Sequence, residues 1–420
     1  MSMPAPANHL LKPFYPALDG LRALAILMVF AYHCVFFIPG VSAMKWGWVG
    51  VDLFFVLSGF LITGILFDTL HQPRFFRDFY VRRALRIFPL FYGFWILFLL
   101  LTPLLHSIVK IGWNNYSWFG VFYLGNFFQS GAIRGIHPDP FALTITTASH
   151  PSVRLVSANH LWSLAVEEQF YFVWPMVVWF VRSRRTLLRI CFATIVFVPL
   201  LRWFLYLHLS HELIGASFLY RNTFTRMDDL LVGAALALWL RGPAVSLPSI
   251  RKGYAGLFAV PLLALTLLMI SSLNRWPSDN ENPIVNTIGF SLIALISASL
   301  LLAAIDVATP FSRILNTRPL ISIGRLSYGI YFFHIFVIQV LSGRSMGILN
   351  KSHHLAPLVA IISFAITYAL AWLSFRFFES PFLRLKSRLA PRPGGMSDPP
   401  AAPLAILPSV LPFDTVRPSA

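Results

Sequence analysis

The chain has 420 residues, of which 57% are hydrophobic and 12% are charged, and its mean hydropathy is +0.70. Soluble domains have roughly 45–50% apolar and about 25% charged residues, so this composition excludes a soluble globular protein and indicates an integral membrane protein. The formal charge of +17 comes from short Lys and Arg clusters between apolar runs. Such clusters are typical of membrane topology signals and do not indicate a nucleic-acid partner.

The cysteines and the N-terminus show no special sequence signals. Cys34 and Cys191 lie in separate apolar runs and belong to no metal-binding or redox spacing, so we expect no disulfide framework and no metal site. The N-terminus lacks a basic region followed by a short apolar core and a cleavage site, so we expect no removable signal peptide.

The apolar residues gather in ten segments, each close to the roughly 20 residues that a helix needs to cross the hydrocarbon of a bilayer. These segments are 18–38, 46–67, 85–106, 160–181, 187–207, 223–240, 254–273, 284–304, 323–342 and 355–377. We therefore predict an all-α, polytopic membrane bundle of about ten transmembrane helices.

Basic residues predict the orientation of the bundle. The segment HQPRFFRDFYVRRALR joins the second and third spans, and RSRR follows the fourth. With ten spans, these and the later basic loops all lie in the cytoplasm, and so do both termini. Counting the shorter apolar stretch 118–128 as a crossing would put RSRR outside. We therefore predict that 107–159 is an extracytoplasmic loop containing a re-entrant or interfacial segment.

Three regions follow from this reading. We expect a cytoplasmic N-terminal segment over 1–13 and a membrane domain over 14–386. The remaining residues, 387–420, are rich in proline and are expected to form a disordered cytoplasmic tail.

Ionisable residues within the predicted spans lie at two depths. Arg22 and His33 are eleven positions apart, so they share a helix face and are separated by roughly 16 Å along the axis. Arg22 then lies near the cytoplasmic surface and His33 in the outer half. The same arithmetic places more ionisable groups in the outer half: Asp52, Glu167, Glu168, Arg202, Asp228, Asp229 and His334, with His160 at the rim. Such groups face a bundle interior or a cavity, and histidines with carboxylates suit general acid–base chemistry.

The inner ends of the spans are cationic. Arg82, Arg83 and Arg86 cluster where the third span begins, at the level of Arg22 and Arg325, and this group is able to hold a cytosolic anion. Structural roles are open beside the functional ones. The arginines are equally typical of positive-inside anchors, and Arg22 is able to pair with Asp19. The buried histidines suit interhelical hydrogen bonds. Arg226 with Asp229 has the spacing of a structural ion pair, and Ser58 that of small-residue helix packing.

Several of these residues also carry a resemblance. LDGLRALAILMVFAYH, in which ten residues separate Arg22 from His33, resembles the R-x10-H signature of the membrane acyltransferase 3 family. Five further segments resemble later blocks of that family in the same order, and the resemblance covers about residues 14–386. These segments are GVDLFFVLSGFLIT, RRALRIFP, HLWSLAVEEQFYFVWP, RMDDLLVGA and LSYGIYFFH.

The resemblance implies an enzyme. Members of the family move an acyl group, usually acetyl, from cytosolic acyl-coenzyme A to a carbohydrate hydroxyl, as on an exopolysaccharide, O-antigen or other cell-surface glycan. It also implies a multi-pass protein of a bacterial inner or plasma membrane. Some relatives add an extracytoplasmic domain. A chain without one would finish the reaction in its own bundle or pass the group to a separate envelope protein, and a homo-oligomer is left open.

Roles follow for individual residues. The family's essential histidine and arginine correspond to His33 and Arg22, and its basic block corresponds to Arg82, Arg83 and Arg86. We expect His33 to act as the base, supported by a carboxylate from Glu167, Glu168 or Asp52. The two adjacent glutamates point about 100° apart, and the sequence does not choose between them. We expect Arg22, Arg325 and the basic block to bind the donor, and His160, Asp228 and His334 to bind the acceptor.

Two other functions fit part of the pattern. Intramembrane His, Asp and Glu also form the proton relays of proton-coupled transporters. Such transporters usually show internal repeats, and the two halves of this chain show no convincing one. A non-catalytic receptor or scaffold would not need the combination of Arg, His and Glu.

Overall fold

The structure is a computed structural model, and it describes most of the predicted membrane domain. The described residues are 15–34, 42–105, 109–111, 117–129, 142–147, 150–157, 159–208, 216–243, 245–271, 284–341 and 356–391. The predicted N-terminal segment 1–13 and most of the predicted tail lie outside them. The first tail residues belong to a helix that ends at Leu389.

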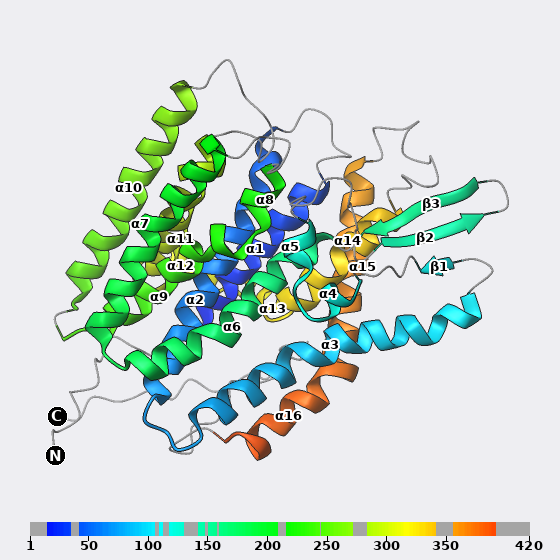
Figure 1. The fold of residues 1–420 in the computed structure, drawn as a ribbon, viewed down its shortest axis with the longest axis horizontal. Coiled ribbons are helices and arrows are strands. Elements are labelled where there is room, and N and C mark those ends of the chain that lie inside the picture. The colour runs from blue at the N-terminus through cyan, green and yellow to red at the C-terminus, as the bar shows by residue number, and fades with distance from the viewer. Residues whose placement is uncertain are drawn as a thin grey trace, which may run out of the picture.

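The described segments form a bundle of long helices (Figure 1). The long helices are α1 (Pro16–Cys34), α2 (Val49–Thr69), α3 (Phe75–Leu105), α6 (Trp162–Val181), α7 (Arg184–His208), α9 (Met227–Leu240), α10 (Leu247–Ser271), α11 (Phe290–Ile305), α14 (Ser327–Leu341) and α15 (Ala356–Leu373). Shorter helices are α4 (Ser117–Val121), α5 (Gly125–Gln129), α8 (Ala216–Arg221), α12 (Pro310–Leu315), α13 (Arg318–Arg325) and α16 (Ser380–Leu389). Short 3-10 and π-helical segments are η2 (Ser42–Trp48), η3 (Asn159–Leu161), η4 (Thr223–Thr225), η6 (Val285–Gly289) and η9 (Ser374–Glu379).

The helical membrane bundle is confirmed, and every predicted span overlaps one long helix. The predicted number of membrane crossings is not confirmed. Within the described residues, seven helical segments are long and apolar enough to cross a membrane, or eight if α13 and α14 form one span bent by 73°. The 14-residue α9 is not one of them. Neither is α3, which runs at a steep angle to α1 and α2 with α16 beside it (Figure 1). About ten crossings and cytoplasmic termini therefore stay predictions.

The centre of the bundle is the packing of α2 against α9. A Cβ atom at Gly59 would overlap the carbonyl oxygen of Leu230, and one at Gly233 would overlap that of Val56. The two backbones touch because neither glycine has a side chain, which is how small residues let helices approach in membranes. From the sequence, Ser58 was expected to have this role. The structure gives it to Gly59 instead, and turns the Ser58 hydroxyl toward a pocket.

The predicted loop 107–159 contains both helix and sheet. Strands β1 (Val109–Ile111), β2 (Ala142–Thr147) and β3 (His150–Ser157) form an antiparallel sheet in the order β1-β2-β3. Val109 faces Ile145 in the first pair of strands, and Leu143 faces Val156 in the second. The all-α prediction did not include this sheet, which extends to one side of the bundle (Figure 1).

Between β1 and β2 the chain turns back on itself through α4 and α5. Tyr123 occupies the left-handed region at the turn, with φ 57°. Gln169 of α6 fixes the turn: its Nε2 donates to the Tyr123 carbonyl at 2.7 Å and to Asn126 Oδ1 at 2.9 Å. Asn126 is fully buried. The re-entrant or interfacial placement of this segment in the membrane stays a prediction.

Candidate active site

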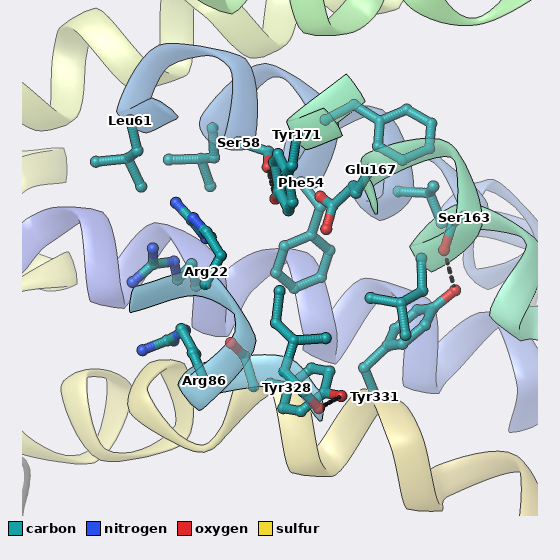
Figure 2. A pocket seen from close by; sticks show the side chains of 17 residues that line it. Arg22, Phe54, Ser58, Leu61, Arg86, Ser163, Glu167, Tyr171, Tyr328 and Tyr331 are labelled. Carbon is teal, nitrogen blue, oxygen red and sulfur yellow. Dashed lines mark hydrogen bonds between the residues drawn. The ribbon is translucent and has the colours of Figure 1, made fainter. Parts of the chain in front are cut away.

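A pocket lies among α1, α2, α3, α6 and α14 (Figure 2). Its cavity volume is about 110 Å³, several times what one water molecule requires. The polar residues that line it are Arg22, Ser58, Arg83, Arg86, Ser163, Glu167, Tyr171, Ser327, Tyr328 and Tyr331. The rest of the wall is apolar: Val51, Phe54, Phe55, Leu57, Leu61, Ile87 and Leu164. Five segments far apart in the sequence thus enclose one narrow, partly charged space.

One end of the pocket is cationic. Arg22 and Arg86 lie on the side away from Ser163 and Tyr331 (Figure 2), and Arg83 places its guanidinium group 4.7 Å from the centre of the Tyr171 ring. The predicted pair of Arg22 with Asp19 is present, with Nη1 and Oδ1 2.9 Å apart. Arg22 nevertheless keeps 27% of its side chain exposed and lines the pocket.

The structure separates the five predicted donor-binding arginines into two groups. Arg22, Arg83 and Arg86 line the pocket, whereas Arg82 and Arg325 do not. Arg325 is nevertheless close to this end, because its Nε lies 3.6 Å from Asp19 Oδ2 and Asp19 thereby bridges it to Arg22.

The middle of the pocket distinguishes the two adjacent glutamates. Glu167 lines the pocket, and its carboxylate lies beside Ser58 and Tyr171, whose hydroxyls are hydrogen-bonded to each other (Figure 2). Glu168 does not line the pocket, and its Oε1 atom is buried with no hydrogen-bond partner among the described residues. Glu167 is therefore the glutamate placed to meet a ligand.

The other end of the pocket is built from two hydroxyls. The Tyr331 hydroxyl donates to the His160 carbonyl at 2.6 Å and lies 2.5 Å from Ser163 Oγ. Ser163 Oγ also donates to the His160 carbonyl at 3.4 Å, so both hydroxyls converge on one acceptor. These two side chains form the wall beyond which three histidines meet.

His33, His160 and His334 come together from α1, η3 and α14. His334 Nε2 lies 3.2 Å from His33 Nδ1, and the centres of the two rings are 4.9 Å apart. The His160 ring centre is 5.1 Å from that of His334, and Tyr331 lies 5.5 Å from both rings. The prediction separated His33, as the base, from His160 and His334, as acceptor ligands. The structure instead joins all three in one cluster behind the Tyr331 end of the pocket.

The hydrogen bonds of His33 determine its tautomer. Its Nδ1 lies 2.8 Å from the carbonyl oxygen of Val29, and a carbonyl only accepts, so Nδ1 carries the proton. The Nε2 atom of the neutral ring then presents a lone pair and is available as a base. Within the described residues, the partners of His33 Nδ1 are the Val29 carbonyl and His334, so the carboxylate predicted to support His33 stays a prediction.

Asp52 and Asp228 belong to a separate, fully buried network of ion pairs. Asp52 Oδ1 lies 2.7 Å from Arg226 Nη2, which also meets Asp229 Oδ2 at 2.9 Å. Asp228 receives two bonds from Arg202, at 3.0 and 2.9 Å. The structural pair of Arg226 with Asp229 is thus confirmed. Asp52, predicted as catalytic, and Asp228, predicted to bind the acceptor, both bond to buried arginines, and neither lines the pocket.

Comparison with known proteins shows the family. The profile described as an acyltransferase domain matches residues 15–376, so the chain belongs to this acyltransferase family. The chain is 30% identical over 390 residues to the peptidoglycan O-acetyltransferase OatA of Listeria monocytogenes, covering 88% of this chain and 56% of that protein. It is 26% identical over 378 residues to the O-acetyltransferase OatA of Staphylococcus aureus, covering 88% of this chain and 57% of that protein.

The chain therefore spans a little over half the length of these relatives. No solved structure matches it significantly. The family membership rests on the same membrane segment that carries the pocket and the histidine cluster.

The sequence reasoning missed the hydroxyl groups of the site. Tyr331 precedes His334 by three residues, and Tyr171 follows Glu167 by four, so each shares a helix face with a residue that was selected. This helical spacing was the sequence signal that could have identified Tyr331 and Tyr171. The bonds of Ser163 with Tyr331 and of Ser58 with Tyr171 join helices more than a hundred residues apart and have no local signature.

Proposed function

We propose that this protein is an integral membrane O-acyltransferase that moves an acetyl group from cytosolic acetyl-coenzyme A to a hydroxyl of a cell-wall glycan. The observation that carries the proposal is the pocket, which has three arginines in its wall and, at its other end, Tyr331 in contact with the histidine cluster. The histidines themselves do not line the pocket. The family supports acyl transfer, and the names of the relatives favour acetyl as the group and peptidoglycan as the glycan class.

The donor fits the cationic end. Coenzyme A carries phosphates, and arginine forks bind phosphate through paired, charge-assisted hydrogen bonds. Arg22, Arg83 and Arg86 would bind the nucleotide end, and that end of the bundle would face the cytosol. The slender pantetheine arm would then run along Phe54, Leu57 and Ile87 and bring its thioester toward Ser163 and Tyr331.

The reaction follows from the tautomer of His33. The Nε2 lone pair takes the proton of the acceptor hydroxyl while the hydroxyl oxygen attacks the thioester carbonyl. The new C–O bond forms and the C–S bond breaks, and the departing sulfur takes the proton back from the His33 imidazolium. The products are the ester and free coenzyme A, with no net proton gained or lost. Glu167 lines the path of the thioester arm, and Ser163 and Tyr331 offer hydroxyls at its end.

The test follows the label in membranes that contain the protein. We would supply acetyl-coenzyme A labelled in the acetyl group together with cell-wall glycan, and measure labelled glycan and free coenzyme A. The wild type should form both in equal amounts, and His33→Ala should lose both by at least about a hundredfold. The matched control is Arg77→Ala, since Arg77 lies on α3 with half of its side chain exposed and does not line the pocket.

Two results would overturn the proposal. One is full acetylation by His33→Ala. The other is movement of a solute across the membrane by the wild type with no consumption of acetyl-coenzyme A, which would favour a transporter.

A further inference from the structure

We propose that His334 positions His33 and stabilises its protonated form, the part that a carboxylate plays in a Ser-His-Asp triad. The inference rests on the proposed function, in which His33 is the base. It assigns to α14 a role in the reaction beyond lining the pocket, and it gives His334 a different task from the acceptor binding that the sequence predicted.

The contact between the two rings carries the inference. His334 Nε2 lies 3.2 Å from His33 Nδ1, although the two residues are 301 positions apart in the chain. His334 is fully buried, and its own Nδ1 lies 2.6 Å from the carbonyl oxygen of Tyr331. Because that carbonyl only accepts, the proton of His334 is on Nδ1, and the lone pair of its Nε2 faces His33.

His33 therefore has one N–H group shared between two acceptors. Its Nδ1–H donates to the Val29 carbonyl at 2.8 Å and to His334 at 3.2 Å. Such three-centre bonds are common in proteins. Two acceptors on different helices fix the ring plane and keep the proton on Nδ1, and this leaves Nε2 as the only nitrogen that can take a proton.

The hydrogen bond between His33 and His334 becomes stronger during the reaction. When His33 Nε2 gains the proton of the acceptor, the ring becomes cationic and its Nδ1–H becomes a stronger donor. The two neutral acceptors then bind the cation more strongly than they bind the neutral ring, so they stabilise the transition state selectively. No carboxylate bonds to either ring nitrogen of His33 within the described residues, so His334 and Val29 supply this stabilisation.

His160 completes the arrangement from the other side. His160 is buried, and its ring stands nearly perpendicular to that of His334 with the centres 5.1 Å apart. Its Nε2 lies 3.3 Å from the carbonyl oxygen of Phe332. The Tyr331 hydroxyl donates to the backbone carbonyl of His160, and the backbone carbonyl of Tyr331 accepts from the His334 ring. Tyr331 thus connects the end of the pocket with the pair formed by His33 and His334.

Two amide substitutions separate positioning from packing. In His334→Gln, the side-chain oxygen can occupy the place of Nε2 and accept from His33. In His334→Asn, the shorter amide can reproduce the bond to the Tyr331 carbonyl but places no acceptor against His33. Both variants keep a polar side chain of similar size in the same cavity.

The experiment measures kcat and KM for acetyl-coenzyme A in purified membranes, normalised to the amount of folded protein from size-exclusion chromatography in detergent. We expect His334→Asn to lower kcat at least about tenfold, with His334→Gln retaining most of the wild-type value. KM for acetyl-coenzyme A should stay unchanged in both variants because the arginine end is untouched.

The outcomes separate this inference from the function on which it rests. Equal kcat values for the Gln and Asn variants, in the presence of an active wild type and an inactive His33→Ala, would overturn the positioning role alone. A wild type that consumes no acetyl-coenzyme A would overturn the proposed function and the inference with it.

Discussion

Asp52 and Arg226 form a fully buried ion pair, with Asp52 Oδ1 2.7 Å from Arg226 Nη2. The Arg226 guanidinium group also lies 4.2 Å from the centre of the Phe290 ring, so it is enclosed by apolar and aromatic side chains. A charge in such a place is stable only while its partners remain, because water cannot replace them. Asp52 therefore shares the neutralisation of Arg226 with Asp229, and its bond to Arg226 links α2 to the start of α9.

This assignment predicts a loss of stability on substitution of Asp52. Asp52→Ala should destabilise the protein by about 1–3 kcal/mol, because it removes a buried hydrogen bond to Arg226 while Asp229 still balances the charge. The matched control is Asp68→Ala, which removes the 57% exposed partner of Arg241 and should cost about 0–1 kcal/mol. Thermal unfolding in detergent measures both. An Asp52→Ala protein as stable as the Asp68→Ala control, but inactive, would return Asp52 to the catalytic residues.

Only pairs of residues that lie close together in the sequence could be predicted from it. Arg22 with Asp19 and Arg226 with Asp229 are each three positions apart, and helix geometry alone brings them together. Asp52 and Arg226 are 174 positions apart, and His33 and His334 are 301 apart. Such pairs depend on how the helices pack, so the sequence predicted a polar layer at one depth and not the partners within it.

At the scale of the elements, the crossing of α2 and α9 positions the α2 side chains of the site. Gly59 touches the Leu230 carbonyl on one face of α2, and the neighbouring Ser58 faces the pocket on another. A change in the distance between the two helices would therefore also move Ser58 relative to Tyr171.

We predict that Gly59→Ala destabilises the protein. The new Cβ would overlap backbone atoms of α9, which cannot rotate away as a side chain can, so the helices must separate. Overpacking of this kind costs typically about 1–3 kcal/mol. Gly256→Ala is the control, since a Cβ at Gly256 of α10 meets nothing within 4 Å and alanine favours a helix. Melting temperatures in detergent compare the two, and a Gly59→Ala variant that melts no lower than Gly256→Ala would contradict the packing.

The elements themselves were largely predictable, because a membrane-crossing helix is a local pattern of about 20 apolar residues. All ten predicted spans overlap long helices. The steep path of α3 and the sheet of β1, β2 and β3 were not predicted. The direction of α3 is set by its neighbours, and β1 pairs with β2 across residues 112–141, so neither feature has a local sequence pattern. The strands β2 and β3 are adjacent in the sequence and pair as a hairpin, which the prediction from apolar spans did not include.

At the scale of the whole molecule, the orientation in the membrane decides which substrate meets which end of the pocket. We predict that the arginine end faces the cytosol and the sheet faces the other side. In a background with Cys34 and Cys191 replaced by alanine, Arg185→Cys should react with an impermeant thiol reagent only after the membrane is opened. Thr144→Cys in β2 should react in intact cells. The reverse pattern would place the donor site on the wrong side for a cytosolic substrate.

We propose that the arginine end of the pocket binds the donor and that His33, in the cluster behind Tyr331, transfers the proton. The measurement that tests it most directly is the initial rate of coenzyme A release against acetyl-coenzyme A concentration, in membranes supplied with cell-wall glycan. Arg83→Ala should raise KM for acetyl-coenzyme A about tenfold or more with little change in kcat, because it removes a phosphate contact. His33→Ala should lower kcat by about 10²–10⁴ with little change in KM. Loss of kcat without a change of KM in Arg83→Ala, or full kcat in His33→Ala, would contradict the account.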